Sequence, residues 1–296
     1  MFMKPDCIPC ILNMSLGYLR KLSLSETRMT DIYTEILNMP PLKGQMWNIT
    51  GPEVIEPIMD RIMKATDNAD PLSFEKEKQN ELMMGLYPKL KHIVNVSENP
   101  LQTAAHIAIL GNAMDIMLLN GTADVQKVIS DQLAHPLPQD TFKVFEDKLA
   151  MSSYVLYFGD NAGEIVLDKL FIETLKEKYE PDIVYVVRGI PALNDATLKD
   201  AVSVGMETLV TVMENGIDGP LPGTRLSRCS GEINDLYQKA DLIISKGGGN
   251  FDTLEEEQKV LKKDMTYMLL SKCHPYHERF GVKIHRPILV NSFGPK

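Results

Sequence analysis

The polar residues with the clearest chemical potential follow short apolar runs in the second half of this chain. Each of three such runs ends in a cluster of acidic, amide, basic or glycine residues. The clusters are Gly159–Glu164, Arg188–Asp195 and Lys246–Asn250. If the runs are parallel strands, their carboxyl ends meet at one edge of a sheet, which is where ligands bind in open α/β folds. We therefore expect these polar side chains to gather in one site.

Two carboxylates and one amide in these clusters have the chemistry of a metal site. Asp160 and Asn161 follow the first run, and Asp195 follows the second. Hard divalent cations such as Mg²⁺ and Mn²⁺ prefer oxygen ligands of these types, with water completing the set. Asp and Asn are also common in turns and as helix N-caps, so the first pair could serve the helix that begins near Gly163. The second acid favours the metal interpretation.

A glycine-rich segment after the third run has the composition of an anion site. Lys246 precedes Gly247, Gly248 and Gly249, and Asn250 follows them. Glycines let backbone N–H groups approach an anion, and a helix N-terminus favours negative charge. The order of residues matches neither the nucleotide-binding P-loop nor the dinucleotide fingerprint. The alternative is a flexible connection without a ligand.

Cysteines near the start of the chain form a C-x-x-C pair. Cys7 and Cys10 could bind metal or act in redox chemistry, and Cys273 could join them. A structural zinc site usually needs four ligands, so that interpretation is incomplete. The alternative is two cysteines packed at the start of a helix.

Two polar residues interrupt an otherwise apolar helical segment. Asn112 and Asp115 are three positions apart, so they share one helix face. They could form a structural hydrogen-bonded pair, since buried polar groups need partners. The sharper hypothesis is that this face caps the active site.

The periodicity of apolar residues changes near residue 153. Before it, apolar residues recur at helical spacing, and after it short β-prone runs alternate with helical segments. Continuous apolar strands that alternate with helices predict a mostly parallel sheet buried on both faces. We therefore predict an α/β fold with a helical domain over 1–148 and a Rossmann-like domain over 149–296. Strands are expected at 154–158, 183–187, 209–212, 242–245, 267–270 and 288–290.

Composition narrows the possible partners. The formal net charge is −9, and no run of five or more Lys or Arg is present. Such a chain is not expected to bind nucleic acid or an anionic membrane. We find no segment with the length and apolar character of a membrane span, and no secretory signal at the start. We expect a cytoplasmic protein whose oligomeric state cannot be read from its sequence.

Together these motifs resemble the damage-control phosphatase family, once known as domain of unknown function eighty-nine. The resemblance covers nearly the whole chain, and the order and spacing of its motifs make it specific. The cysteine pair is similar to the branch found in archaea and other microbes. The motifs are Asp6–Cys10, Gly111-Asn112 with Asp115, Gly159–Glu164, Arg188-Gly189, Asn194–Thr197, Asp241–Gly247, Asn250 and Lys272-Cys273.

This resemblance implies divalent-metal-dependent hydrolysis of small phosphorylated metabolites, such as sugar phosphates or related damaged metabolites. The metal could be Mn²⁺, Mg²⁺, Co²⁺ or Ni²⁺, with Asp160, Asn161 and Asp195 as its ligands. Lys246 would hold the phosphate together with Gly247 and Asn250. The residues expected on the substrate side are Glu164, Arg188, Asn194, Asn112 and Asp115.

Two rival functions remain open at this point. The first is a carboxyl methyltransferase that uses S-adenosylmethionine, for which Gly159–Gly163 would be a poor cofactor turn. The second is a non-enzymatic protein that binds metal or nucleotide, centred on the three cysteines. The nucleophile of the predicted hydrolysis, water or Asp160, also stays open.

Overall fold

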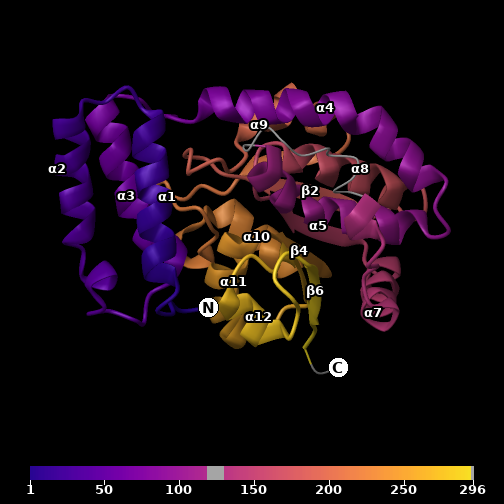
Figure 1. The fold of residues 1–296 in the computed structure, drawn as a ribbon. Coiled ribbons are helices and arrows are strands. Elements are labelled where there is room, and N and C mark those ends of the chain that lie inside the picture. The colour runs from indigo at the N-terminus through magenta and orange to yellow at the C-terminus, as the bar shows by residue number, and fades with distance from the viewer. Residues whose placement is uncertain (119–129, 295–296) are drawn as a thin grey trace.

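The structure is a computed structural model that describes residues 1–118 and 130–294, without the side chains of 112–118. A six-stranded sheet lies at its centre, with helices on both faces, and α1, α2 and α3 stand side by side at one end (Figure 1). The strands are β1 (Tyr154–Phe158), β2 (Asp182–Val187), β3 (Thr211–Glu214), β4 (Leu242–Lys246), β5 (Met265–Leu270) and β6 (Pro287–Ser292).

Helices form where the sequence shows helical periodicity. Those described in the first half are α1 (Cys7–Lys21), α2 (Glu26–Leu37), α3 (Gly51–Thr66), α4 (Ser73–Asn95), α5 (Pro100–Leu118) and α7 (Gln139–Ala150). Those of the second half are α8 (Glu164–Lys176), α9 (Leu198–Ser203), α10 (Gly231–Lys239), α11 (Gly248–Leu261) and α12 (His274–Phe280). Short 3₁₀ turns occupy Pro40–Lys43, Met206–Thr208 and Leu226–Arg228.

Side-chain caps explain where several of these helices begin. Ser25 accepts a hydrogen bond from the backbone N–H of Arg28 at the start of α2. Thr50 and Glu53 form a reciprocal capping box at the start of α3. Such caps satisfy backbone N–H groups that have no partner within the helix.

The strand order is β3-β2-β1-β4-β5-β6. The first five strands pair in parallel, and β6 pairs with β5 in the antiparallel sense. This is the order of a Rossmann-like sheet, in which the winding direction reverses between β1 and β4. The predicted fold class is confirmed, and all six predicted strands form.

Three large hydrophobic clusters of the described residues hold the helices to one another and to the sheet. One joins α4, α5, α7 and α8 to one face of the sheet, and a second packs α10, α11 and α12 on the other face. The third lies within α1, α2 and α3. The domain boundary near residue 148 stays a prediction, and it coincides with the change from helices to alternating strands and helices.

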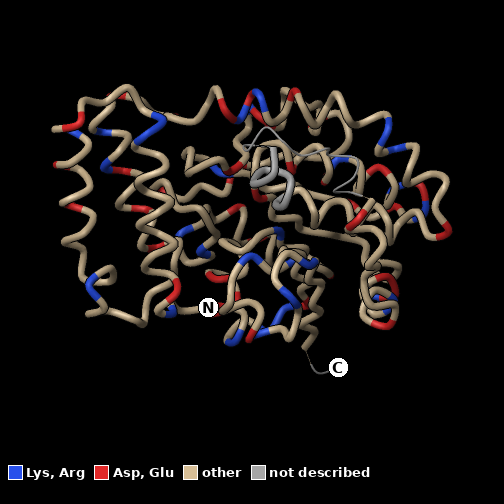
Figure 2. The backbone as a smooth tube through the Cα atoms, in the orientation of Figure 1, with Lys and Arg blue, Asp and Glu red and all other residues tan. Residues whose placement is uncertain are grey.

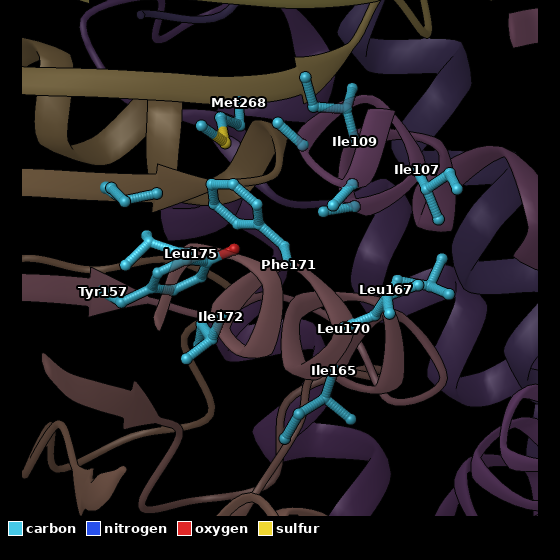
Figure 3. Close-up of a cluster of buried hydrophobic side chains, with 14 of the residues drawn as sticks. Ile107, Ile109, Tyr157, Ile165, Leu167, Leu170, Phe171, Ile172, Leu175 and Met268 are labelled. Carbon is cyan, nitrogen blue, oxygen red and sulfur yellow. The ribbon is translucent and has the colours of Figure 1, made fainter. Parts of the chain in front are cut away.

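Aromatic side chains lie at the centre of the first cluster. Figure 3 shows Phe171 of α8 between Tyr157 of β1 and Met268 of β5. The ring centroid of Phe171 lies 6.3 Å from the ring centroid of Phe145 and 6.5 Å from that of Tyr157. This packing attaches α8, whose first residue is Glu164, to the sheet.

Acidic and basic residues are scattered along the backbone and occur in every part of the molecule that is described (Figure 2). Within the described ranges, no helix combines the length and apolar character that crossing a bilayer requires. The expectation that the chain binds neither nucleic acid nor membrane stays a prediction.

Replacing Phe171 with Ala should destabilise the protein by about 3–5 kcal/mol, because a large buried ring is lost and a cavity remains. Urea unfolding measures this difference. The matched control is Phe74→Ala, whose side chain is 62% exposed and lies under Lys78. That change should cost less than about 1 kcal/mol. Equal losses for the two variants would contradict the assignment of α8 to the core.

Candidate active site

Backbone hydrogen bonds join the loops that follow β1 and β2. The N–H of Ala196 donates to the carbonyl of Asp160, and the N–H of Ala162 donates to the carbonyl of Asn194, both at 2.8 Å. Asn161 and Asp195 face each other across an antiparallel bridge. The structure therefore brings Asp160, Asn161 and Asp195 together at the carboxyl edge of the sheet, as the sequence predicts.

The close approach of Asp160 to the chain after β4 requires a glycine. Gly247 has a φ of +76°, and a Cβ at this position would lie 1.8 Å from Oδ2 of Asp160. Both the backbone conformation and the missing side chain are needed, so another residue would displace the carboxylate. Gly248 already belongs to α11, which limits the predicted glycine loop to its first member.

Arg188 forms a buried clamp between the two acids. Its Nε donates to Oδ2 of Asp195 at 2.6 Å, and its Nη2 lies 3.8 Å from Oδ1 of Asp160. The remaining contacts are hydrogen bonds of 3.0 Å from Nη1 to Thr224 and from Nη2 to Asn250. The planar guanidinium thus fixes the direction of the Asp195 carboxylate by a hydrogen bond, and it attracts Asp160 by charge over a longer distance.

Asn250 connects this clamp to the strand ends. Its Nδ2 donates to the carbonyls of Gly159 and Lys246 at 2.9 and 2.8 Å. Its Oδ1 accepts from Arg188 and from Thr224. Because every contact is buried, Asn250 holds the ends of β1 and β4 in register with Arg188.

The acids at this edge suit a cation by charge as well as by type. Asp160 and Asp195 are 6% and 3% exposed, and Arg188 is the guanidinium placed between them. Burial raises the pKa of Asp195 against the opposing charge of Arg188, and together with the neighbouring charge of Asp160 it brings that pKa to about 7. Two carboxylates beside one guanidinium leave an excess negative charge, which a divalent cation would offset.

The donor set would need water to complete a coordination shell. In the described part of the chain, no three His, Cys, Asp or Glu side chains are arranged to hold a metal ion. The predicted ligands are two carboxylates and the amide of Asn161. A site with few protein ligands is typical of Mg²⁺, which usually keeps several waters. The residues present thus fit a hydrated divalent cation, and metal binding stays a prediction.

Lys246 lies beneath this site in a buried ion cluster. Its Nζ donates to the carbonyl of Ala108 at 2.9 Å, to Oδ1 of Asp168 at 2.6 Å, and to Glu164. These three bonds use the three protons of the ammonium group. Burial alone would lower the pKa of Lys246, but Asp168 and Glu164 raise it above its ordinary value. The ammonium therefore contacts protein groups here, and its predicted contact with phosphate stays a prediction.

Asp168 is a member of this cluster that the sequence analysis missed. Its carboxylate also accepts hydrogen bonds of 2.8 Å from the hydroxyls of Tyr157 and Tyr185. The available signal was its position one helical turn after Glu164, which places both acids on one face of α8. Thr224, which bonds Arg188 and Asn250, was also missed as a site residue, although it ends the glycine- and proline-rich segment 215–224 that follows β3.

A cavity of about 560 Å³ opens above the strand-end acids. Asp160, Asn161, Asn194 and Asp195 line it on the side of the sheet, and α1 and α3 line the opposite side. Lys272, which follows β5, is an exposed cation on the same cavity. A second hollow of about 400 Å³ is lined mainly by α11, α12, β6 and the residues after β6, away from these acids.

The predicted cysteine group also lines the larger cavity. Cys7, Cys10 and Cys273 are free thiols there, and burial raises the pKa of each. Their possible role as a second metal or redox site stays a prediction.

Asn112 and Asp115 belong to α5, but their side chains lie outside the described residues. Their predicted role on the substrate side therefore stays a prediction. Just before them, a Cβ at Gly111 would lie 2.6 Å from Cγ of Glu164, so a glycine is needed where α5 passes over α8.

Replacing Lys246 with Met should destabilise the protein by about 3–5 kcal/mol, because Glu164 and Asp168 would lose their shared cation in a buried environment. Urea unfolding at neutral pH measures this loss. Lys259→Met is the control, since Lys259 pairs with Glu256 on the surface, where an ion pair contributes only about 0–1 kcal/mol. A Lys246→Met variant as stable as the control would show that the cluster is not needed for folding.

Comparisons with known proteins agree with this architecture. A crystal structure of a DUF89 family protein from Pyrococcus horikoshii superposes with a TM-score of 0.84 over 99% of each chain, at 24% identity. An uncharacterized protein of Methanocaldococcus jannaschii is 30% identical over 97% of this chain and 94% of its own length. A damage-control phosphatase of Archaeoglobus fulgidus is 29% identical over 76% of both chains.

The family profile described as the damage-control phosphatase ARMT1-like domain matches residues 3–286. With nearly the whole chain matched, and with a relative that is 30% identical over almost its full length, this protein belongs to the damage-control phosphatase ARMT1-like family.

Proposed function

We propose that this chain is a phosphatase that hydrolyses phosphate monoesters of small metabolites with the help of a divalent cation. The observation that carries the proposal is the buried set of Asp160, Asn161 and Asp195 on a cavity at the carboxyl edge of the sheet. Membership of the family and the name of the relative in Archaeoglobus fulgidus support the phosphatase activity.

The residues around the cavity would have different roles in binding the cation and the phosphate. Arg188 holds the two carboxylates toward a common ligand, and Asn250 keeps Arg188 in place. A cation bound by these acids would neutralise the phosphate oxygens as the ester bond breaks. Lys272 lies on the same cavity, and its charge lowers the pKa of Asp195, so it can attract the phosphate to this side.

The roles of the other predicted residues depend on whether they line the cavity or lie beneath it. Asn194 lines it and can contact the substrate. Gly247 makes room for Asp160. Glu164 and Lys246 are positioning residues, because they hold the start of α8 against the end of β4 beneath the acids.

The first test is hydrolysis of para-nitrophenyl phosphate by the metal-stripped protein, with Mg²⁺, Mn²⁺, Co²⁺ and Ni²⁺ returned singly. Asp160→Asn and Asp195→Asn should each lower metal-restored kcat/KM by at least about 100-fold, because each removes a ligand charge. Asp31→Asn, on the exposed surface of α2, should leave it unchanged.

Full turnover in the stripped protein, or wild-type rates in both acid variants, would contradict the proposed metal site. Failure to hydrolyse this ester and a panel of natural phosphate monoesters with every metal would contradict the phosphatase itself.

A second test shifts the position of the Asp160 carboxylate while leaving the residue itself unsubstituted. Gly247→Ala should lower kcat/KM by about 100-fold, because the new methyl group displaces the carboxylate. Gly281→Ala is the matched control, since Gly281 has a φ of +67° but open space around it. Both variants carry the backbone strain of alanine at positive φ, which a thermal melt measures.

Only the first variant should lose activity. Equal activity in the two would mean that the position of Asp160 is not critical for turnover.

A further inference from the structure

The cavity above the strand ends has two chemically different sides. Its floor carries carboxylate and amide groups from the loops after β1 and β2, as described above. The opposite wall is formed largely by apolar side chains. The wall residues are Ile11, Met14 and Tyr18 of α1, Ile55 of α3, Leu72 before α4, and Leu193 from the loop after β2.

The apolar wall follows from the spacing of residues on α1. Ile11, Met14 and Tyr18 recur at intervals of three and four residues, so they lie on one helix face. Ile11 is 4% exposed and belongs to the core of the α1–α3 bundle, whereas Met14 and Tyr18 are half-buried. One face of α1 therefore contributes Ile11 to the core of the α1–α3 bundle and contributes Met14 and Tyr18 to the cavity.

Leu193 extends this wall to the side of the acids. It packs against the core of the α1–α3 bundle, two residues before Asp195. Its φ of +51° is the left-handed region, which is uncommon for a residue with a bulky side chain. Glycine or asparagine would adopt this backbone at lower cost, so an apolar side chain is present here despite strain.

The size of the cavity leaves room for more than the phosphate. At about 560 Å³ it falls within the range of about 300–1,000 Å³ that is typical of sites for drug-sized ligands. The charged residues Asp6, Lys21, Glu75 and Asp252 also line the cavity. A ligand that fits the polar floor and the apolar wall has a phosphate at one end and an apolar body beside it.

We propose that the wall formed by Met14, Tyr18, Ile55 and Leu193 binds the alcohol portion of the phosphate ester. The preferred substrate class is then a phosphate monoester whose alcohol carries a hydrocarbon or flat ring body. A fully hydroxylated sugar is a poorer fit, because its hydroxyl groups would lose water against carbon without gaining partners. This inference rests on the proposed phosphatase function and narrows its substrate.

The test compares n-alkyl phosphates of increasing length with the wild-type protein under the metal conditions that give turnover. Ethyl, butyl and hexyl phosphate have nearly equal leaving groups, so differences among them report binding of the chain. Each buried methylene is expected to raise kcat/KM by about fourfold until the wall is covered. We expect at least a tenfold rise from ethyl to hexyl phosphate, and lower kcat/KM for glucose 6-phosphate than for hexyl phosphate.

Variants of the wall provide a second, independent measurement. The double variant Met14→Ala and Ile55→Ala should reduce the preference for hexyl over ethyl phosphate by at least about fivefold. Its kcat/KM for hexyl phosphate should fall more than its kcat/KM for ethyl phosphate, because the longer chain has more carbon to bury against the wall. Met84→Ala is the control, since Met84 is 36% exposed on α4, and it should leave the series unchanged.

The outcomes separate this inference from the function on which it rests. A kcat/KM that does not change with chain length in the wild-type protein, with turnover present, overturns the apolar wall and leaves the phosphatase standing. A chain-length preference that the double variant retains in full also overturns it. Absence of turnover on every ester overturns the proposed function, and the wall inference falls with it.

Discussion

The buried ammonium group of Lys246 is the interaction on which the site depends. An unpaired charge at 0% exposure would be very unfavourable, so the surrounding chain must supply compensating groups. Glu164 and Asp168 of α8 and the carbonyl of Ala108 of α5 do so. One charge at the end of β4 thereby sets where two helices from distant parts of the sequence pack.

The cluster also determines the course of the loops above it. Glu164 begins α8 directly after the loop that carries Asp160 and Asn161, and Lys246 directly precedes Gly247. Holding Glu164 to Lys246 therefore brings the loop after β1 beside the chain after β4. Arg188 lies closer to the cavity than Lys246 does, and it hydrogen-bonds both Asp195 and Asn250. Two buried cations, one below and one beside the acids, keep the floor of the cavity in a single arrangement.

Much of this fold could be predicted because parallel strands buried on both faces read as continuous apolar runs. The boundaries were less accurate where a turn is also apolar. Leu209 and Val210 were expected in the third strand, but they follow a 3₁₀ turn, and β3 covers Thr211–Glu214. Grouping Asp160, Asn161 and Asp195 needed only the rule that strand ends meet at one edge.

The direction of individual side chains was harder to predict. For Lys246, the sequence predicts contact with phosphate from the residue type and its place at a strand end, but it does not predict the buried partners that the structure shows. Side chains alternate along a strand, so Lys246 lies on the same face of β4 as Ile244, which belongs to the core shared with α5 and α8. The face of β4 on which Lys246 lies could be predicted from this alternation. Its hydrogen-bond partners on that face could not be predicted, because Ala108 and Asp168 lie on helices whose packing against β4 is not evident from the sequence.

The floor and the wall of the cavity come from parts of the chain with separate hydrophobic cores. The acids lie on loops of the sheet, whereas α1 and α3 pack around a core of their own. Substitutions of Met14 or Tyr18 on α1 therefore act first on the bundle core, and they reach the loop that carries Asp195 through Leu193. Leu193 is the point where the two parts meet, since it follows β2 in the chain and packs against the bundle. Its strained backbone is maintained by that packing, so the position of the wall is coupled to the loop that carries Asp195.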